Sequence, residues 1–207
     1  MSEKRLGMLL DLSLCIGCNA CVVACKQENA VPLTCFNTWI ESWDAKSESG
    51  VRRVNMQKLC NHCEDAPCVR LSPTGASYKA EDGTVQVDPE KCIGCKYCMA
   101  ACPYQARYQL ESGEVEKCTF CHHRSSQGML PACVATCVTH ARYFGDLNDP
   151  DSDISKKLAE KGGEALYADL GLNPSVFYIG LSETNAMPVA SAVHRGGNVV
   201  KPYEGVN

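Results

Sequence analysis

Two stretches of the sequence share one cysteine spacing: CIGCNACVVAC at residues 15–25 and CIGCKYCMAACP at residues 92–103. Each holds four cysteines in the frame C-x2-C-x2-C-x3-C, and Pro103 follows the last cysteine of the second run. This frame is typical of bacterial ferredoxins, in which three thiolates of one loop bind three corners of an iron–sulfur cubane. One short loop cannot reach the fourth corner, so the last cysteine of each run is expected to serve another cluster.

Two further cysteine groups lie between and after these runs. Residues 60–73 read CNHCEDAPCVRLSP, which keeps the frame with a longer middle gap and places Ser72 where the last cysteine is expected. Residues 118–137 hold a fourth group with the spacing C-x2-C-x11-C-x3-C, and Cys35 lies outside all four groups. The groups therefore offer sixteen ligand positions, filled by fifteen cysteines and Ser72.

Zinc and disulfide bonds are alternative uses of so many cysteines. A four-thiolate zinc site uses two C-x2-C pairs, which the second and fourth groups could supply, but it has no use for three cysteines on one tight loop. Cysteines that recur every third residue also suit disulfide pairing poorly. Iron–sulfur clusters account for all four groups, and we interpret the cysteines in that way.

Composition narrows the class of protein further. The chain has 207 residues, of which 16 are cysteine and only 7% are aromatic, so the cysteines are expected to stabilise a thin core. A net charge of −4 argues against nucleic-acid binding through phosphate neutralisation. No run of about 18 apolar residues is present, so we expect no membrane span. No small-residue cleavage site precedes Cys15, and we expect a β-strand over Leu6–Leu12 rather than a signal peptide.

Two ferredoxin runs usually form one pseudo-symmetric unit in which each run gives its last ligand to the other cluster. The second and third groups are adjacent and fit one unit, which leaves the first and fourth groups for the other. The spacing alone also permits pairing one with two and three with four. Under the nested pairing, the ligand sets are Cys15, Cys18, Cys21 and Cys137 for cluster one; Cys60, Cys63, Cys68 and Cys102 for cluster two; Cys92, Cys95, Cys98 and Ser72 for cluster three; and Cys118, Cys121, Cys133 and Cys25 for cluster four.

Ser72 affects the expected type of cluster three, because a hydroxyl is a harder and less acidic ligand than a thiol. Three outcomes are compatible with it: an alkoxide on iron, a water or hydroxide at that corner, or loss of the corner iron. We therefore expect three [4Fe–4S] clusters and a fourth that is either a [4Fe–4S] cluster with an altered corner or a [3Fe–4S] cluster. Cys35 is expected to be a buried thiol, although it could replace Ser72 as a ligand.

Other residues beside the cysteines could tune the clusters. Gly17 and Gly94 would let backbone N–H groups approach the inorganic sulfurs. His62 and His122 lie beside ligand cysteines, where a hydrogen bond could tune a cluster, or they are solvated or structural. Three lysines flank the cluster loops, where they are either solvated or partly compensate the cluster charge: Lys91, Lys96 and Lys117.

These patterns predict an α+β fold with two pseudo-symmetric bacterial-ferredoxin-like units, inserted β-hairpins and an extended C-terminal tail. Short helices are expected at residues 18–29 and 95–101, a later helix at 154–161 and a strand at 175–180. The expected organisation is unit A at residues 1–30 and 111–145, an inserted hairpin at 31–54, unit B at 55–110, and a C-terminal helix, strand and partner-binding tail at 146–207.

The order and spacing of the groups resemble the four-cluster electron-transfer subunits of the DMSO reductase family of molybdopterin oxidoreductases. Stretches that carry the resemblance include CNHCEDAPCVRLSPTGASYK at 60–79, DPEKCIGCKYCMAACPYQARY at 88–108 and EKCTFCHHR at 116–124. The polysulfide, thiosulfate, tetrathionate and arsenate reductase subunits look most similar. The chain departs from the pattern at Ser72, where cysteine is expected, and at Val138, where proline often follows the fourth ligand.

The resemblance implies a non-catalytic subunit that relays single electrons between a molybdopterin catalytic subunit and a quinone-reactive membrane subunit. It also implies clusters ordered one, two, three, four, with cluster one nearest the molybdenum. The periplasmic face, reached by export with the catalytic partner, is the expected location, and a cytoplasmic complex is the alternative. A hydrogenase or formate dehydrogenase subunit and a free polyferredoxin are the alternative functions. The terminal substrate is set by the catalytic subunit.

Overall fold

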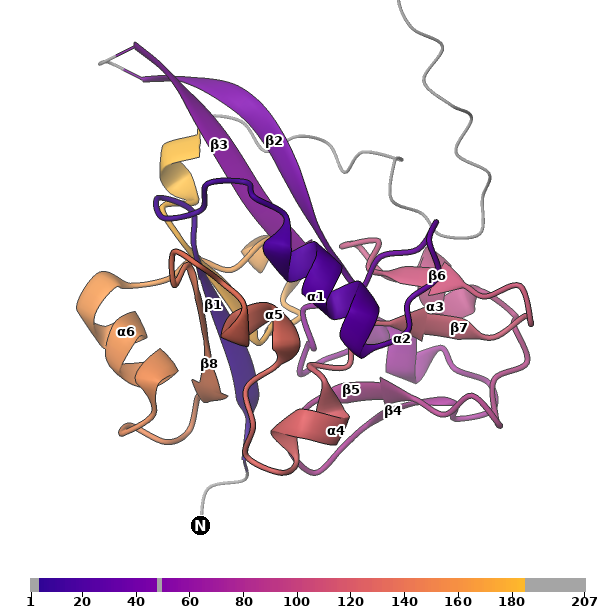
Figure 1. Cartoon of the computed structure of the whole chain (residues 1–207). Coiled ribbons are helices and arrows are strands. Elements are labelled where there is room, and N and C mark those ends of the chain that lie inside the picture. The colour runs from indigo at the N-terminus through magenta and orange to yellow at the C-terminus, as the bar shows by residue number, and fades with distance from the viewer. Residues whose placement is uncertain (1–3, 48–49, 185–207) are drawn as a thin grey trace, which may run out of the picture.

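The structure, a computed structural model, describes residues 4–47 and 50–184 (Figure 1). Its strands are β1 (Leu6–Asp11), β2 (Thr38–Ser47), β3 (Gly50–Leu59), β4 (Ser77–Lys79), β5 (Val85–Val87), β6 (Arg107–Gln109), β7 (Val115–Lys117), β8 (Arg142–Asp146) and β9 (Val176–Ile179). Its helices are α1 (Ala20–Glu28), α2 (Pro67–Arg70), α3 (Tyr97–Ala100), α4 (His122–Ser125), α5 (Ala132–Ala135) and α6 (Asp153–Lys161), with 3-10 turns at Ala168–Leu170 and Ser182–Thr184.

A three-stranded sheet joins the N-terminal and C-terminal parts of the described residues. β1 is buried along its whole length and lies between β8, which is antiparallel to it, and β9, which is parallel. Its apolar run LGMLL suits a strand that is covered on both faces. α6 packs against β8 and β1, and it begins after Ser152, whose hydroxyl accepts a hydrogen bond from the backbone N–H of Ser155.

β2 and β3 form a long antiparallel hairpin that projects from the rest of the molecule (Figure 1). The first residues of β3 are mostly exposed, whereas Val54 to Leu59 are buried against the core. This buried half carries the hairpin beyond the expected limit at residue 54 and up to the residue before Cys60. Residues on the inner half therefore hold the second cysteine group against the core.

Four helices each carry the third cysteine of one group. These cysteines are Cys21 in α1, Cys68 in α2, Cys98 in α3 and Cys133 in α5. The helices expected from Cys18 and Cys95 begin two residues later than predicted. The reason is that Asn19 and Lys96 precede them in the left-handed conformation, with φ of 60° and 64°, which a right-handed helix cannot include.

The helices pair in a way that brings distant cysteine groups together. α1 packs against α5, and α2 packs against α3. The first group is thereby placed beside the fourth, and the second beside the third. The short hairpins β4–β5 and β6–β7 follow the last ligand positions of the second and third groups.

The C-terminal part of the described residues belongs to the same body. The expected helix at 154–161 lies within α6, and the expected strand at 175–180 contains β9, which completes the sheet. The partner-binding tail expected at the C-terminus lies, from residue 185 onwards, outside the described residues. Within the described residues, no helix is both long and apolar enough to span a bilayer.

Candidate iron–sulfur sites

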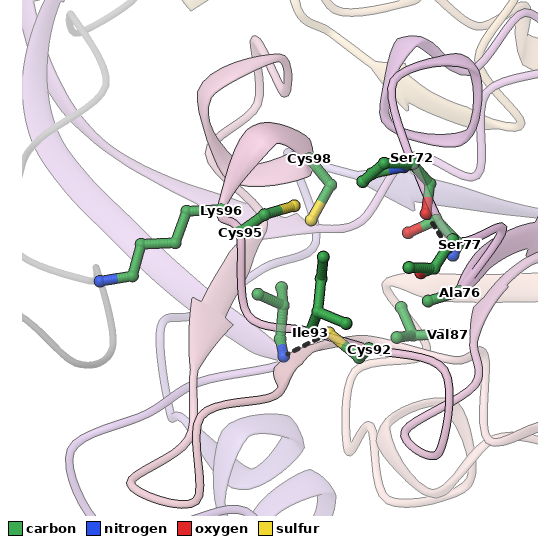
Figure 2. A pocket seen from close by; sticks show the side chains of 12 residues that line it. Ser72, Ala76, Ser77, Val87, Cys92, Ile93, Cys95, Lys96 and Cys98 are labelled. Atoms are coloured by element: carbon green, nitrogen blue, oxygen red, sulfur yellow. Dashed lines mark hydrogen bonds between the residues drawn. The ribbon is translucent and has the colours of Figure 1, made fainter.

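The third cysteine group and Ser72 line one pocket, shown in Figure 2. Cys92, Cys95 and Cys98 come from the loop before α3 and from its first turn, whereas Ser72 follows α2. The backbone N–H of Val115 donates a hydrogen bond to the Cys92 sulfur over 3.4 Å. The pocket thus collects three thiols from one loop and one hydroxyl from the neighbouring group.

The hydroxyl oxygen of Ser72 accepts a hydrogen bond at the position where a fourth cluster ligand is expected. The backbone N–H of Ser77 donates to Ser72 Oγ over 3.1 Å, and the buried guanidinium of Arg107 donates to Ser77 Oγ over 2.8 Å. Cys35 is not among the lining residues of this pocket; it packs with Val31 and Tyr108 in a separate small cluster. The structure therefore gives no support to Cys35 as a substitute ligand.

The fourth group and Cys25 line a second pocket together with Phe120. Its thiols are Cys118, Cys121 and Cys133, which lie around the end of α1 that holds Cys25. The side-chain amide of Asn29, just after α1, reaches the sulfurs of both Cys25 and Cys121 over 3.6 Å. This amide ties a thiol of the first group to a thiol of the fourth.

Electrostatic interactions at Cys63 link the second group to Cys102. Burial raises the pKa of the Cys63 thiol to about 12, and the charges of Cys60 and Cys102 add to the effect. Cys68 acts on Cys63 in the same way. Cys60, Cys68 and Cys102 therefore all act on Cys63, although Cys102 belongs to the third group in sequence.

The first group is linked to a distant part of the chain by Arg142. The charge of Cys21 acts on Cys15, whose pKa is raised chiefly by burial. Cys21 accepts a hydrogen bond from Arg142 over 3.4 Å, and the charge of Cys137 also acts on Arg142. Cys18 lies on the same loop and is exposed.

The donor sets fit iron–sulfur clusters better than the alternatives. All sixteen cysteines are free, so none is used in a disulfide bond. Within the described part of the molecule, no three Cys, His, Asp or Glu side chains are placed to hold a single metal ion. Two of the expected four-residue ligand sets, here called quartets, line pockets: those of the third and fourth groups. This arrangement suits thiols that bind the corners of a polynuclear cluster rather than one zinc ion.

The C-x-x-C loops are shaped by residues with positive φ. Gly17 and Gly94 have φ of 70° and 67°. A Cβ at Gly17 would lie 2.7 Å from Asn55 Oδ1, and one at Gly94 would lie 2.5 Å from the carbonyl oxygen of Gly113. Both positions favour glycine for the backbone conformation, and Gly94 also for its close approach to the backbone of Gly113.

Two buried arginines lie between pairs of groups. Burial tends to lower the pKa of Arg142, but the charges of Cys133 and Cys21 outweigh it and raise that pKa above its usual value. For Arg107, burial is likewise outweighed by the charges of Cys68 and of other thiols that include Cys98, which raise its pKa. Arg142 thus bridges the first and fourth groups, and Arg107 bridges the second and third.

Lys117 lies between the second and fourth groups and links them. It is buried and donates hydrogen bonds to the carbonyl oxygens of Val85 and Cys118. Burial lowers its pKa, while the charges of Cys60 and Cys118 act in the opposite direction. Lys117 is therefore a buried charge between the second and fourth groups and not a solvated one.

These links place the fourth group beside both the first and the second, and the second beside the third. They favour the order one, four, two, three over the order one, two, three, four that the resemblance implied. The physical reason is the helix pairing, because α5 carries the fourth group back to α1 and leaves the second and third groups together.

Sequence reasoning overlooked the two arginines and Asn29. The arginines do have a signal, because CPYQARY at 102–108 and CVTHARY at 137–143 repeat the pattern C-x3-A-R-Y. The stretch SPTGASY at 72–78 is a third copy, with serine at the positions of both cysteine and arginine. Asn29 has no comparable signal, since only the packing of α1 shows which sulfurs it reaches.

The fold and the cysteine quartets define a ferredoxin-type iron–sulfur protein. Family profiles agree with this class: a 4Fe-4S binding domain matches residues 8–28, and a 4Fe-4S dicluster domain matches residues 51–147.

Curated relatives narrow the class further. The protein is 43% identical to the B subunit of tetrathionate reductase from Salmonella typhimurium, over 90% of its own length and 77% of the relative. It is 43% identical to the B component of polysulfide reductase from Wolinella succinogenes, over 85% and 94%. It is also 40% identical to the iron-sulfur B subunit of a putative dimethyl sulfoxide reductase from Halobacterium salinarum, over 84% and 78%. The protein belongs to the family of electron-transfer iron–sulfur subunits of molybdopterin oxidoreductases.

Proposed function

We propose that this subunit relays single electrons through four iron–sulfur clusters in the spatial order one, four, two, three. The bound clusters supply the one-electron redox chemistry. The observation that carries the proposal is the pair of pockets in which three cysteines of one group lie with one residue of another: Ser72 with the third group and Cys25 with the fourth. The ligand sets are those of the nested pairing, which divides the chain into two pseudo-symmetric units.

Partner proteins bind at the two ends of this series of clusters, beside the first and third groups. Cys18 in the first group and Cys95 in the third are the exposed cysteines, whereas those of the second group are buried except for the half-buried Cys102 that joins them. Apolar side chains surround both ends: Ile16 and Val138 are 64% and 66% exposed, and Ile93 is 67% exposed. Exposed apolar surface of this kind is typical of interaction sites.

The partners at these ends are a molybdopterin catalytic subunit and an integral-membrane subunit that reacts with quinone. The names of the relatives support a reductase catalytic subunit as one partner. The subunit itself transforms no substrate, and we place the complex on the periplasmic face of the membrane. Fractionation of cells that express the tagged complex tests this location.

Ser72 completes the third cluster as an alkoxide ligand, which makes all four clusters [4Fe–4S]. The Ser72 oxygen accepts a hydrogen bond from a backbone N–H, that of Ser77. The sulfur of Cys137, an expected ligand, likewise accepts one from the backbone N–H of Ala141 over 3.3 Å. Donors of this type stabilise an anionic ligand. The alternative is a [3Fe–4S] cluster that lacks the iron at this corner.

Two measurements on the anaerobically purified complex test the proposal together. Iron analysis is expected to give about sixteen atoms per chain, with no [3Fe–4S] signal in the EPR spectrum of the oxidised protein. Molybdenum is expected to copurify in a catalytic subunit. About fifteen iron atoms and an oxidised-state EPR signal would assign the open corner to Ser72, whereas a nickel partner or little iron would overturn the function itself.

A further inference from the structure

The third residue of each leading C-x-x-C pair has a left-handed backbone conformation in all four groups. In the first and third groups this residue is glycine. In the second and fourth groups it is His62, with φ of 42°, and Phe120, with φ of 56°. A bulky side chain is strained in this region and glycine is not. The protein thus keeps two strained ring-bearing residues at positions that glycine fills elsewhere in the same chain.

The two rings stack on each other between the second and fourth groups. Their centroids are 3.7 Å apart and their planes are inclined by 23°. Both residues are buried, with exposed fractions of 0% and 1%. The His62 ring is fixed because its Nδ1 accepts a hydrogen bond from the backbone N–H of Val85 over 3.0 Å. Phe144 meets Phe120 edge-on, with centroids 5.4 Å apart.

The stack joins two ligand loops by direct ring contact. His62 is bonded to Cys63, and Phe120 is bonded to Cys121 and lines the pocket of the fourth group. In the spatial order of the groups, this junction is the step from the α2–α3 pair to the α1–α5 pair. Strain that persists at one place usually marks a constraint imposed by function.

We propose that the His62–Phe120 stack is the electron-transfer contact between the second and fourth groups. The inference rests on the proposed function. One electron leaves the site on one side of the stack and enters the site on the other, and no bond forms or breaks. The two residues act as positioning residues, because their ring contact fills the junction and holds the two ligand loops at a fixed separation.

His62→Asn is the deciding variant. Asparagine tolerates the left-handed conformation and keeps an acceptor for the Val85 N–H, but it removes the ring. Phe120→Leu removes the other ring and keeps an apolar side chain. Phe144→Leu is the matched control, since it removes a ring that touches Phe120 but lies outside the stack. All three are made in the complete complex and compared for iron content, midpoint potentials and transfer rate.

The rate is measured by photoreduction with an external one-electron donor, followed by rapid freezing and EPR of each cluster. We expect His62→Asn and Phe120→Leu to slow transfer across this junction about tenfold, with iron content and potentials unchanged, and Phe144→Leu to transfer at the normal rate. A fully loaded His62→Asn complex with the normal rate would overturn the inference. The wild-type iron content and EPR spectra test the proposed function separately, so the two failures are distinguishable.

Discussion

Single buried side chains set the charge around the cysteine groups. Lys117 is 2% exposed and lies between the second and fourth groups, whereas Lys96, on the loop of the third group, is exposed. A reduced cluster carries one more negative charge than an oxidised one, and a buried cation nearby stabilises it. Lys117 should therefore raise the midpoint potentials of clusters two and four, and Lys96 should have little influence on any potential.

Lys117→Met is expected to lower the midpoint potentials of clusters two and four by about 60 mV, a tenfold change in the one-electron equilibrium. Redox titration followed by EPR measures the shift. Lys96→Met is the control and should leave the potentials almost unchanged because solvent screens its charge. Equal shifts in the two variants would contradict a role for burial.

Ser72→Cys tests the altered corner of cluster three. Cysteine at position 72 restores the softer ligand, so the midpoint potential of cluster three should rise while the iron content stays the same. Ser72→Ala should lose the corner iron and give the EPR signal of an oxidised [3Fe–4S] cluster. Identical spectra for wild type and Ser72→Ala would mean that the serine oxygen does not bind iron.

At the scale of an element, the β2–β3 hairpin is held by a buried ion pair. Lys58 Nζ lies 2.7 Å from Glu41 Oε2, and both side chains are less than 10% exposed. The Trp39 indole N–H donates to the other oxygen of Glu41 over 3.0 Å. Farther out, Arg53 and Asp44 form a pair that is 59% exposed on both sides.

Lys58→Met should destabilise the protein by about 3 kcal/mol, because it leaves the Glu41 carboxylate buried without its cation. Arg53→Met, on the exposed half of the same hairpin, should cost less than about 0.5 kcal/mol. Loss of the visible cluster absorbance on heating compares the two. If both variants melted like wild type, the inner half of the hairpin would not be part of the cooperative core.

The connection between β1 and α6 depends on Asp11, at the end of the strand. Its carboxylate accepts hydrogen bonds from the backbone N–H and hydroxyl of Ser13 and pairs with Lys161 over 3.2 Å. Burial tends to raise the pKa of Asp11, but these contacts outweigh it and hold the pKa below the ordinary value of an aspartate. The stabilisation is thus present above the unfolded pKa and is lost as the pH falls through the lower folded value.

Asp11→Asn is expected to cost about 1–3 kcal/mol of stability, by the same amount throughout about pH 5–8. Urea unfolding at several pH values in that range measures the difference from wild type. A penalty that shrank as the pH rose from 5 to 8 would contradict a carboxylate that is ionised throughout the range.

At the scale of the whole molecule, the proposed order makes cluster four an internal link. In the order one, four, two, three, loss of cluster four separates cluster one from the other two. In the order one, two, three, four, cluster four would be terminal and its loss would leave a connected row. Cys121→Ala, which removes one of its ligands, therefore distinguishes the two orders.

Electrons delivered at the cluster-three end of the Cys121→Ala complex should no longer reduce cluster one, as followed by EPR. The remaining clusters should keep their own signals. Cys35→Ala is the control, because Cys35 packs with Val31 and Tyr108 away from the quartets and should leave the relay intact. Normal reduction of cluster one in a Cys121→Ala protein that lacks cluster four would contradict the order proposed here.

Local patterns predicted two of the helices that carry cysteines, α1 and α3, but not α2 or α5. The spacing C-x2-C-x2-C-x3-C requires a tight loop followed by a helix turn, and the structure has such helices at α1 and α3. Their first residues were misjudged because a left-handed residue before each helix, such as Asn19, has no clear signal in the sequence. Apolar runs predicted β1 and β9 as strands, but not that they pair in parallel.

Cysteine spacing alone was enough to predict which residues bind iron, because ligand chemistry belongs to the side chain and its local spacing. The sequence also marked Ser72 as the exception and, through the repeated C-x3-A-R-Y stretches, contained the two arginines. Tertiary structure alone decided which groups are neighbours, that Lys117 is buried, and that His62 stacks on Phe120. These facts depend on contacts between residues far apart in the chain, and such contacts form only when the helices and hairpins pack.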